Sequence, residues 1–401
     1  MKHFSYGWVV LVGLLLIYTA SNGIALNTAP LFFPDIMKEF GLDQAQIQRG
    51  PALLFLLIAL LSPFMGYLLD RFNARILITI GAVGLVLDIF FFSAISSYPQ
   101  FLIFYVGYSL CLALCGIISS MYLVTNWFGQ HRGKAVGILL LGSSLGGAIF
   151  PPLAGKWIKT IGWHGAAYQL SFIAAAFILI PLLFIRNKKQ TPTTKSQVTL
   201  PNNDVTLKEA ASTPTFYLLL IGTSVLWFCI NGIINNNALY LKDLQLDSGQ
   251  SGKIIGLFFA WAMFGKLFFG FLSDYFSKKI IMLLAIVNLL AGAILLYLTT
   301  TDQSLLSAYA ICFGIGFSGA FTMIQLLVAE LYQGQHYGRI LGVVTMVDTL
   351  AGSAGALGLG ILRKTSGSYV SSFQLMIALC VVSLVATLFI KKTNIQIANA
   401  H

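Results

Sequence analysis

The sequence predicts an all-α integral membrane protein with twelve transmembrane helices arranged in two pseudo-symmetric six-helix bundles. Its composition, its regular apolar runs and an internal repeat support this prediction. Of the 401 residues, 57% are hydrophobic and 9% are charged, whereas a soluble domain carries about 25% charged residues. A soluble protein of this length could not bury so much apolar surface, so the solvent must be lipid. This composition excludes a disordered chain, a nucleic-acid-binding module and most soluble enzymes.

Apolar runs long enough to cross a bilayer follow one another along the chain. A bilayer core of about 30 Å needs about 20 apolar residues per helix. We expect spans at 7–34, 49–69, 76–96, 100–127, 134–156, 163–185, 215–240, 251–272, 280–300, 304–330, 339–362 and 368–390. The first run is too long for a signal peptide and leads into the next span without a small-residue cleavage site, so we expect it to be retained.

The longest connection between predicted spans is the segment 186–214. It is polar, rich in Thr and Asn, and holds five basic residues and three prolines. We therefore expect residues 1–185 to form an N-terminal six-helix bundle, residues 186–214 a cytoplasmic linker and residues 215–401 a C-terminal six-helix bundle.

The distribution of basic residues predicts the orientation. Lys and Arg are enriched on the cytoplasmic side of membrane proteins. With both termini inside, fifteen of the 24 Lys and Arg residues fall in cytoplasmic segments and eight in external loops. We expect a multi-pass protein of the cytoplasmic (inner) membrane with both termini in the cytoplasm. The net charge of +11 then reflects topology and requires no nucleic acid.

Two motifs recur at a nearly constant offset. Residues 66–75, after the second span, match residues 270–279, after the eighth, at an offset of 204. Residues 129–137 match residues 334–342 at an offset of 205. Two matches at nearly one offset indicate a duplicated six-helix unit. Transporters built this way bind their substrate between the halves, near the midplane.

The loop at 66–75, Gly-x-x-x-Asp-Arg followed by a second Arg, resembles the signature loop of the major facilitator superfamily. The resemblance covers nearly the whole chain and departs where Asn73 replaces a usual Gly, a mild change because Asn tolerates a left-handed backbone. An Asp in this loop can pair with Arg or Lys of the other half when the cytoplasmic side closes. The resemblance implies gating roles for Asp70, Arg71, Arg75, Arg132 and Asp274.

A narrower resemblance involves the run 126–138, with Trp-Phe followed by Arg-Gly-Lys-Ala-Val-Gly, and the Gly-rich stretch 142–147. Together with Tyr-Gly-Trp at 6–8, this resembles the monocarboxylate transporters and the oxalate:formate antiporters. The resemblance implies a secondary active transporter that moves a small organic anion by alternating access. The Gly-rich stretch has a second interpretation, since small residues also allow close helix packing.

Three ionisable residues, Asp88, Lys266 and Asp348, lie well inside predicted spans, where charges are costly and often functional. At 1.5 Å per residue, Lys266 lies about 9 Å and Asp348 about 14 Å from the cytoplasmic helix ends. We expect both to face the central cavity, close enough to influence each other. The alternatives are a structural ion pair, or a Lys266 that extends to the interface. For Asp88, on a peripheral span, we expect a structural hydrogen bond.

The resemblance implies that Lys266 replaces an Arg that holds the substrate carboxylate in related carriers. Relatives carry further charges where this chain has Ala262, Thr345 and Asn27. The site thus offers one cation and one carboxylate. This disfavours a dianion such as oxalate and favours a monoanion, a zwitterion or a proton-coupled mechanism in which Asp348 accepts the proton.

Other polar and aromatic residues fall on the spans expected to line the pore. Asn and Tyr offer neutral hydrogen-bonding groups that suit a small polar solute, although they also serve as contacts between membrane helices. The further substrate-binding candidates are Asn27, Tyr122, Asn231, Asn235, Phe321 and Gln325.

The sequence lacks the motifs of an enzyme or an ATP-driven pump. It contains no His/Asp/Glu cluster, no Walker-type loop and no nucleotide-binding glycine fingerprint. We expect no cofactor and no metal, with a small-molecule substrate, protons and the lipid bilayer as partners of a monomer. Two alternatives stay open: an exporter or importer of a drug, siderophore or amino acid, and a membrane receptor that does not transport.

Overall fold

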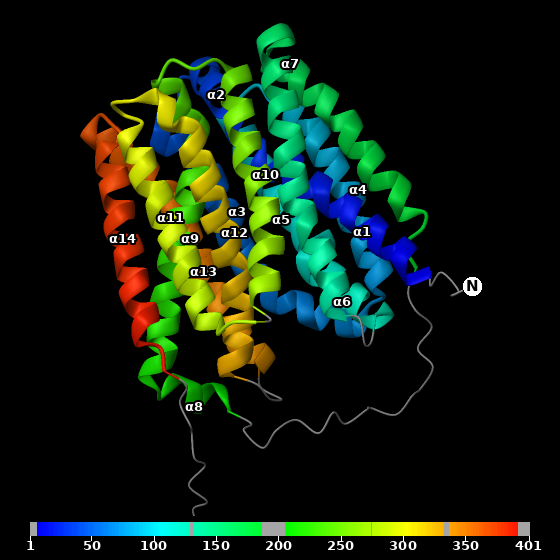
Figure 1. Cartoon of the computed structure of the whole chain (residues 1–401). Coiled ribbons are helices and arrows are strands. Elements are labelled where there is room, and N and C mark those ends of the chain that lie inside the picture. The colour runs from blue at the N-terminus through cyan, green and yellow to red at the C-terminus, as the bar shows by residue number, and fades with distance from the viewer. Residues whose placement is uncertain (1–5, 129–131, 187–204, 274, 333–336, 392–401) are drawn as a thin grey trace, which may run out of the picture.

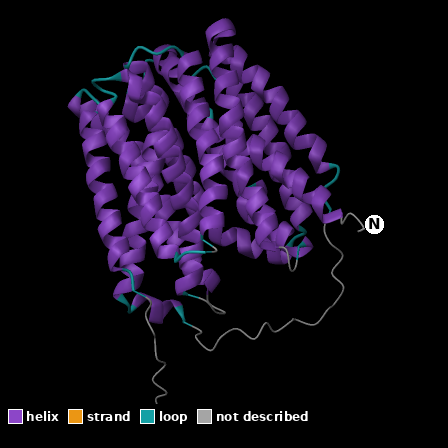
Figure 2. Cartoon of the chain, in the orientation of Figure 1, coloured by secondary structure: helices purple, strands orange, loops and turns teal. Residues whose placement is uncertain are grey.

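The computed structural model describes residues 6–128, 132–186, 205–273, 275–332 and 337–391. Within these residues the chain forms helices joined by short connections, without a strand (Figure 2). The helices are α1 (Tyr6–Asn22), η1 (Gly23–Asn27), η2 (Ala29–Phe32), α2 (Phe33–Phe40), α3 (Gln44–Arg71), α4 (Ala74–Ser93), α5 (Tyr98–Cys115), α6 (Ile117–Trp127), α7 (Arg132–Leu182), α8 (Leu207–Ala211), α9 (Pro214–Asp243), α10 (Ser248–Leu272), α11 (Lys278–Leu298), η3 (Gln303–Leu305), α12 (Leu306–Leu331), α13 (Tyr337–Ser366) and α14 (Val370–Phe389).

Eleven segments of the described chain are long and apolar enough to cross a membrane. One of them lies in α7, whose 51 residues would form a straight helix of about 77 Å, far longer than a bilayer is thick. Gly162 interrupts α7 with φ 75° and ψ 171°, and α7 turns back on itself in Figure 1. This break confirms the separate spans predicted on either side of it, and dividing α7 there gives the expected twelve.

Two predicted spans are not continuous α-helices. The fourth is divided at Gly116, whose φ of −76° and ψ of −152° are extended, although Tyr98–Val124 is still one membrane-crossing segment, as predicted. The first changes into the π-helix η1 at Gly23, which packs against Gly146 of α7. A Cβ at Gly23 would lie 2.5 Å from the Cα of Gly146. Hydrophobic length predicts a span but not such interruptions, which depend on a neighbouring backbone.

The helices pack in two groups, α1 to α7 and α8 to α14, which lie side by side in Figure 1. In the first, α1 packs on α7, and α4 packs on α5 and α7; in the second, α9 packs on α13 and α14, and α12 packs on α10 and α11. The groups meet along two helix pairs, α3 with α13 and α7 with α10. This arrangement agrees with the predicted pair of bundles.

Contacts between the groups concentrate toward one face. We call the face that carries α8 the linker face and the opposite one, which carries α2, the distal face (Figure 1). On α3, Gln48 Nε2 donates to Asn235 O at 2.9 Å, and Ser353 Oγ of α13 donates to Ala52 O at 2.8 Å. Two ion pairs, Lys159–Asp247 and Lys364–Asp43, also join the groups near the distal face. These contacts hold the distal ends of the two groups together.

Small residues allow α7 and α10 to approach closely. A Cβ at Gly252 would lie 2.4 Å from Pro151 O, and one at Gly155 would lie 2.2 Å from Ser248 O. Because both obstacles are backbone atoms, a methyl group at either position must push the groups apart. The observed distal packing therefore requires glycine at these positions.

We expect Gly252→Ala to lengthen the distance between the distal ends of the two groups. Electron–electron double resonance between spin labels at Ile161 and Gln303, both in or beside distal connections, should report the change in a cysteine-free background. Gly342→Ala is the matched control, because a Cβ there meets nothing within 4 Å. An unchanged distance in Gly252→Ala would show that α7 and α10 do not need this close contact.

Candidate functional site

Lys266 joins the two groups of helices inside the membrane region. It lies on α10 with only 7% of the residue exposed. Its Nζ atom donates to Ser143 Oγ at 2.7 Å and to Leu140 O at 3.1 Å, both on α7. The same Nζ lies 5.1 Å from the centre of the Phe321 ring on α12. The ammonium group is therefore held within the bundle, which argues against extension to the interface.

The partners of this ammonium group are all neutral. A hydroxyl, a carbonyl and a ring face stabilise a cation, but none of them balances its charge. None of the ion pairs formed between described residues includes Lys266. A buried cation with neutral partners is suited to bind an anion, which would supply the missing charge.

Ser143 connects Lys266 to α1 and η1. Its hydroxyl accepts the Lys266 hydrogen bond, and its carbonyl accepts a hydrogen bond of 2.9 Å from Asn27 Nδ2. The side chain of Tyr18 also interacts with that of Ser143. Of the predicted candidates, Asn27 is thus brought next to Lys266 through Ser143. Ser143 itself was missed, although it stands in the Gly-rich run, because a serine among glycines is equally typical of helix packing.

Phe321 connects Lys266 to α9. Its ring lies 5.8 Å from that of Trp227, centre to centre. Trp227 O accepts a hydrogen bond of 3.1 Å from Asn231 Nδ2, one turn along α9. The predicted candidates Phe321 and Asn231 therefore belong to the surroundings of Lys266, together with Trp227, which was not among the candidates.

The other predicted binding residues lie elsewhere or at the margin. Asn235 is 2% exposed, and its backbone oxygen and amide group are used by Gln48 and by Asn231 O, so it holds the two groups together. Tyr122 on α6 and Gln325 on α12 are half-buried. The hydrogen-bond and ring partners found for Lys266 among the described residues do not include these three.

Asp348 forms a second buried polar site. It is 2% exposed on α13 and accepts hydrogen bonds from Thr223 Oγ1 at 2.8 Å and Ser224 Oγ at 3.0 Å, both on α9. The ion pairs of the described residues do not include one between Asp348 and Lys266. In this conformation the two residues bind different helices, so the alternative of a structural ion pair is not realised. Thr223 and Ser224 had no distinguishing sequence signal.

Asp88 departs from the expected hydrogen bond. Its Oδ2 atom is buried without a partner among the described residues, and its Oδ1 faces Gly107 of α5, where a Cβ would approach to 2.5 Å. The side chain packs between α4 and α5 and is not one of the residues found around Lys266.

Of the predicted gating residues, Arg71 and Arg75 are exposed at the end of α3 and the start of α4. The side chains of Asp70 and Arg132, and residue Asp274 as a whole, lie outside the described residues. Their gating roles stay predictions.

A cavity of about 770 Å³ opens at the distal face and is distinct from the Lys266 site. Lys38, Lys242 and Arg363 line it. Two of these cations are already engaged: Lys242 Nζ donates to Pro34 O at 3.3 Å, and Arg363 Nε lies 2.8 Å from Asp243 Oδ2. We place the candidate site at Lys266 and not in this distal cavity, because Lys266 is buried and has no anionic partner among the described residues.

Comparison with known proteins supports a transporter. The chain is 27% identical to a fujikurins efflux protein of Gibberella fujikuroi over 82% of this chain and 70% of that one. It is 24% identical to an uncharacterized MFS-type transporter of Bacillus subtilis over 94% and 92% of the two chains. It is 23% identical to the oxalate:formate antiporter of Oxalobacter formigenes over 87% and 84%.

The fold agrees with a solved transporter structure. A bacterial homologue of the human lysosomal transporter Spinster, in an inward-facing and unoccupied conformation, superimposes with a TM-score of 0.74 at 20% identity over 97% of both chains. The sequence pattern of the Major Facilitator Superfamily matches residues 15–356 and 219–399. With twelve spans, two packed groups and this match, the chain belongs to the Major Facilitator Superfamily of membrane transporters.

Proposed function

We propose that this protein is a secondary active transporter that moves a small, monocarboxylate-like organic anion across the cytoplasmic membrane by alternating access, coupled to protons. The observation that carries the proposal is Lys266, a buried cation whose partners are all neutral. A substrate carboxylate would balance its charge and could accept the hydrogen bonds that Lys266 Nζ now donates to Ser143 Oγ and Leu140 O. A single cation favours a monoanion over a dianion.

Proton coupling is assigned to Asp348. A carboxylate in the membrane region with two hydroxyl donors is costly while it is charged, and a proton removes that cost. Asp348 is hydrogen-bonded to α9, and α9 also carries Trp227, which packs beside the Lys266 site. Protonation of Asp348 therefore acts on a helix that borders this site. This link supports proton uptake at Asp348 as the step that alternates with substrate binding at Lys266.

The contacts between the two groups support alternating access. The hydrogen bonds and ion pairs between the two groups lie between Lys266 and the distal face. We therefore propose that the site is reached from the linker face in this conformation. In the proposed topology the two bundles are residues 1–185 and 215–401, residues 186–214 are the linker, and both termini are cytoplasmic. The linker face is then the cytoplasmic face, and this conformation faces inward. Asp70, Arg71, Arg75, Arg132 and Asp274 would then form the gate that closes the linker face.

The distal ion pairs should not respond to pH in the physiological range. Hydrogen bonds from Lys364 and Lys159 hold the pKa values of Asp43 and Asp247 below the usual 3.8. A lowered pKa means that each pair stabilises distal closure above about pH 4 and loses this effect only in stronger acid. Both pairs are largely exposed, so each contributes about 0.5 kcal/mol.

We therefore expect Asp43→Asn together with Asp247→Asn to shift the closed fraction only a few-fold, and any response between pH 5 and 8 to persist in this variant. The distance between spin labels at Ile161 and Gln303 provides the measurement. A pH response that disappears with these two carboxylates would place the proton sensor at the distal face and not at Asp348.

A second candidate is an exporter of a larger or less charged compound, since one matching relative is named an efflux protein. A thermal-shift screen of the purified protein with monocarboxylates, dicarboxylates, amino acids and amphipathic cations, at pH 7.5 and 5.5, separates the two. Stabilisation by monocarboxylates that increases at pH 5.5 is expected. Selective stabilisation by cations or amphipathic compounds would contradict the proposed substrate.

A further inference from the structure

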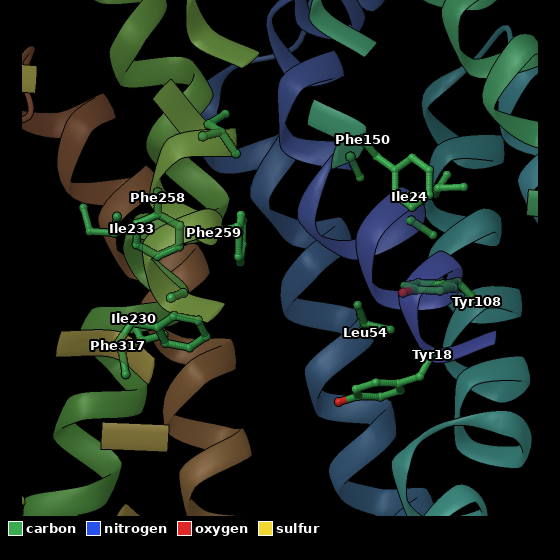
Figure 3. Close-up of a cluster of buried hydrophobic side chains, with 14 of the residues drawn as sticks. Tyr18, Ile24, Leu54, Tyr108, Phe150, Ile230, Ile233, Phe258, Phe259 and Phe317 are labelled. Atoms are coloured by element: carbon green, nitrogen blue, oxygen red, sulfur yellow. The ribbon is translucent and has the colours of Figure 1, made fainter. Parts of the chain in front are cut away.

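A third internal repeat relates the first span to α9. Residues 18–27 read Tyr-Thr-Ala-Ser-Asn-Gly-Ile-Ala-Leu-Asn, and residues 227–236 read Trp-Phe-Cys-Ile-Asn-Gly-Ile-Ile-Asn-Asn, at an offset of 209. Both segments have an aromatic residue, then Asn-Gly-Ile one turn later and a further Asn. Figure 3 shows the equivalent Ile24 and Ile233 at similar heights on opposite sides of the view. The repeat therefore places Asn22 and Asn231 at equivalent positions in the two groups.

The two asparagines share one hydrogen bond to their own helix, and Asn22 Nδ2 also donates to Ser21 Oγ at 3.2 Å. Asn22 Nδ2 donates to Tyr18 O at 3.3 Å, and Asn231 Nδ2 donates to Trp227 O at 3.1 Å. They are 8% and 4% exposed. Because a carbonyl can only accept, the NH₂ group of each side chain must face the helix backbone, and the amide oxygen is directed elsewhere. The hydrogen bonds between described residues leave both amide oxygens without a donor.

Both asparagines lie next to the surroundings of Lys266. Tyr18 interacts with Ser143, which binds Lys266. Trp227 packs on Phe321, whose ring faces Lys266. Each Asn is one turn, about 6 Å, beyond its aromatic residue. Asn22 also lines a cavity of about 100 Å³ together with Tyr18.

We propose that Asn22 and Asn231 bind a hydrogen-bond donor of the substrate whose carboxylate is held by Lys266. This inference rests on the proposed function and narrows its substrate class. The amide oxygens accept hydrogen bonds, so the substrate is a short monocarboxylate that carries a hydroxyl or ammonium group, and a simple alkyl carboxylate is a poorer ligand. One acceptor comes from each group of helices, so an ammonium group can donate to both, whereas a hydroxyl group, with one O–H, donates to one of them.

The equivalent pair Asn27 and Asn236 has a different role. Asn27 Nδ2 donates to Ser143 O of α7, and Asn236 Nδ2 donates to Ala356 O of α13. Both amides are engaged with the backbone of a neighbouring helix, so they fix helix positions. Asn236 Oδ1 also accepts from Gln48 Nε2 and Tyr369 OH, whereas the NH₂ groups of Asn22 and Asn231 bind a carbonyl of their own helix.

The test uses lactate and propionate, which have the same carboxylate and differ by one hydroxyl group. Isothermal titration calorimetry on the purified full-length protein should show that lactate binds about tenfold more tightly than propionate, because propionate leaves buried acceptors unpaired. Because the single hydroxyl group of lactate donates one hydrogen bond, at least one of Asn22→Ala and Asn231→Ala should reduce this preference to threefold or less. Asn288→Ala is the matched control, because its Nδ2 makes the same bond to Leu284 O on α11.

The outcomes distinguish this inference from the proposed function. Equal affinities of the wild-type protein for lactate and propionate would overturn the inference and leave the proposed function in place. A lactate preference that persists in both Asn variants would also overturn it. Failure of both acids to bind would contradict the proposed function itself. If an alanine variant does not fold, Asn→Leu at the same position conserves the side-chain volume and gives the same test.

Discussion

Replacing Lys266 by Ala is expected to lower the affinity for lactate about 100-fold. The substitution removes the one charged side chain that the described residues place at the site, and the loss of one partner of a buried charge pair costs about 2–5 kcal/mol. Titration calorimetry on purified protein measures the change. Lys266→Arg should recover part of the affinity, because it keeps the charge but not the geometry with Ser143 and Leu140.

Lys253→Ala provides the control for this substitution. Lys253 lies on the same helix but is exposed, so its removal should leave lactate affinity within about twofold. The size-exclusion profile of each variant shows whether it still folds. A Lys266→Ala protein that folds and binds lactate like the wild type would remove Lys266 from the substrate site.

Replacing Asp348 by Asn is expected to abolish accumulation driven by a proton gradient while exchange of substrate across the membrane continues. Asn keeps the shape of the side chain and can accept from Thr223 and Ser224, but it cannot take up a proton. Proteoliposomes with an imposed pH gradient measure accumulation, and counterflow with equal pH on both sides measures exchange. Accumulation should fall at least tenfold, with counterflow changed less than threefold.

Asp88→Asn is the matched control for Asp348→Asn. Asp88 is also a carboxylate within a predicted span, but it packs between α4 and α5. We expect its variant to keep gradient-driven accumulation. Equal loss of accumulation in the two variants, or loss of exchange in Asp348→Asn, would show that Asp348 does not act as the specific proton acceptor.

The number and limits of the spans could be predicted because a bilayer imposes a simple length rule on apolar helices. The two spans on either side of Gly162 were predicted separately, and the non-helical backbone at Gly162 divides α7 between them. The interruptions at Gly23 and Gly116 could not be predicted. They depend on the close approach or the local path of the backbone, and hydrophobicity does not record either.

The candidate site was only partly predictable. Lys266 and Asp348 stand out because charge is rare in an apolar span. Their actual partners, Ser143, Thr223 and Ser224, are small hydroxyl residues of a kind that occurs in many membrane helices. Only the packing of α7 against α10 and of α9 against α13 shows which of them meet a charge.

Asn235 is a predicted binding residue that the structure places in a contact between helices instead. It shares residue type and neighbourhood with Asn231 and was an equally good candidate. Successive residues of an α-helix are rotated by about 100°, so Asn235, four residues after Asn231, lies on nearly the same side of α9. The two residues therefore differ in what they contact and not in the side of the helix on which they lie. Gln48 of α3 reaches the Asn235 backbone, and that contact between distant segments has no trace in the local sequence.

Uptake of labelled lactate into proteoliposomes, with wild-type and Lys266→Ala protein side by side, tests the central claim most directly. We predict that the wild-type protein accumulates lactate when the side of entry is made acidic, that uptake declines when the gradient is collapsed, and that the Lys266→Ala protein gives only the background of empty liposomes. Lactate binding without any flux in the wild-type protein, or equal uptake by the two proteins, would contradict the assignment of a proton-coupled monocarboxylate carrier that works through Lys266.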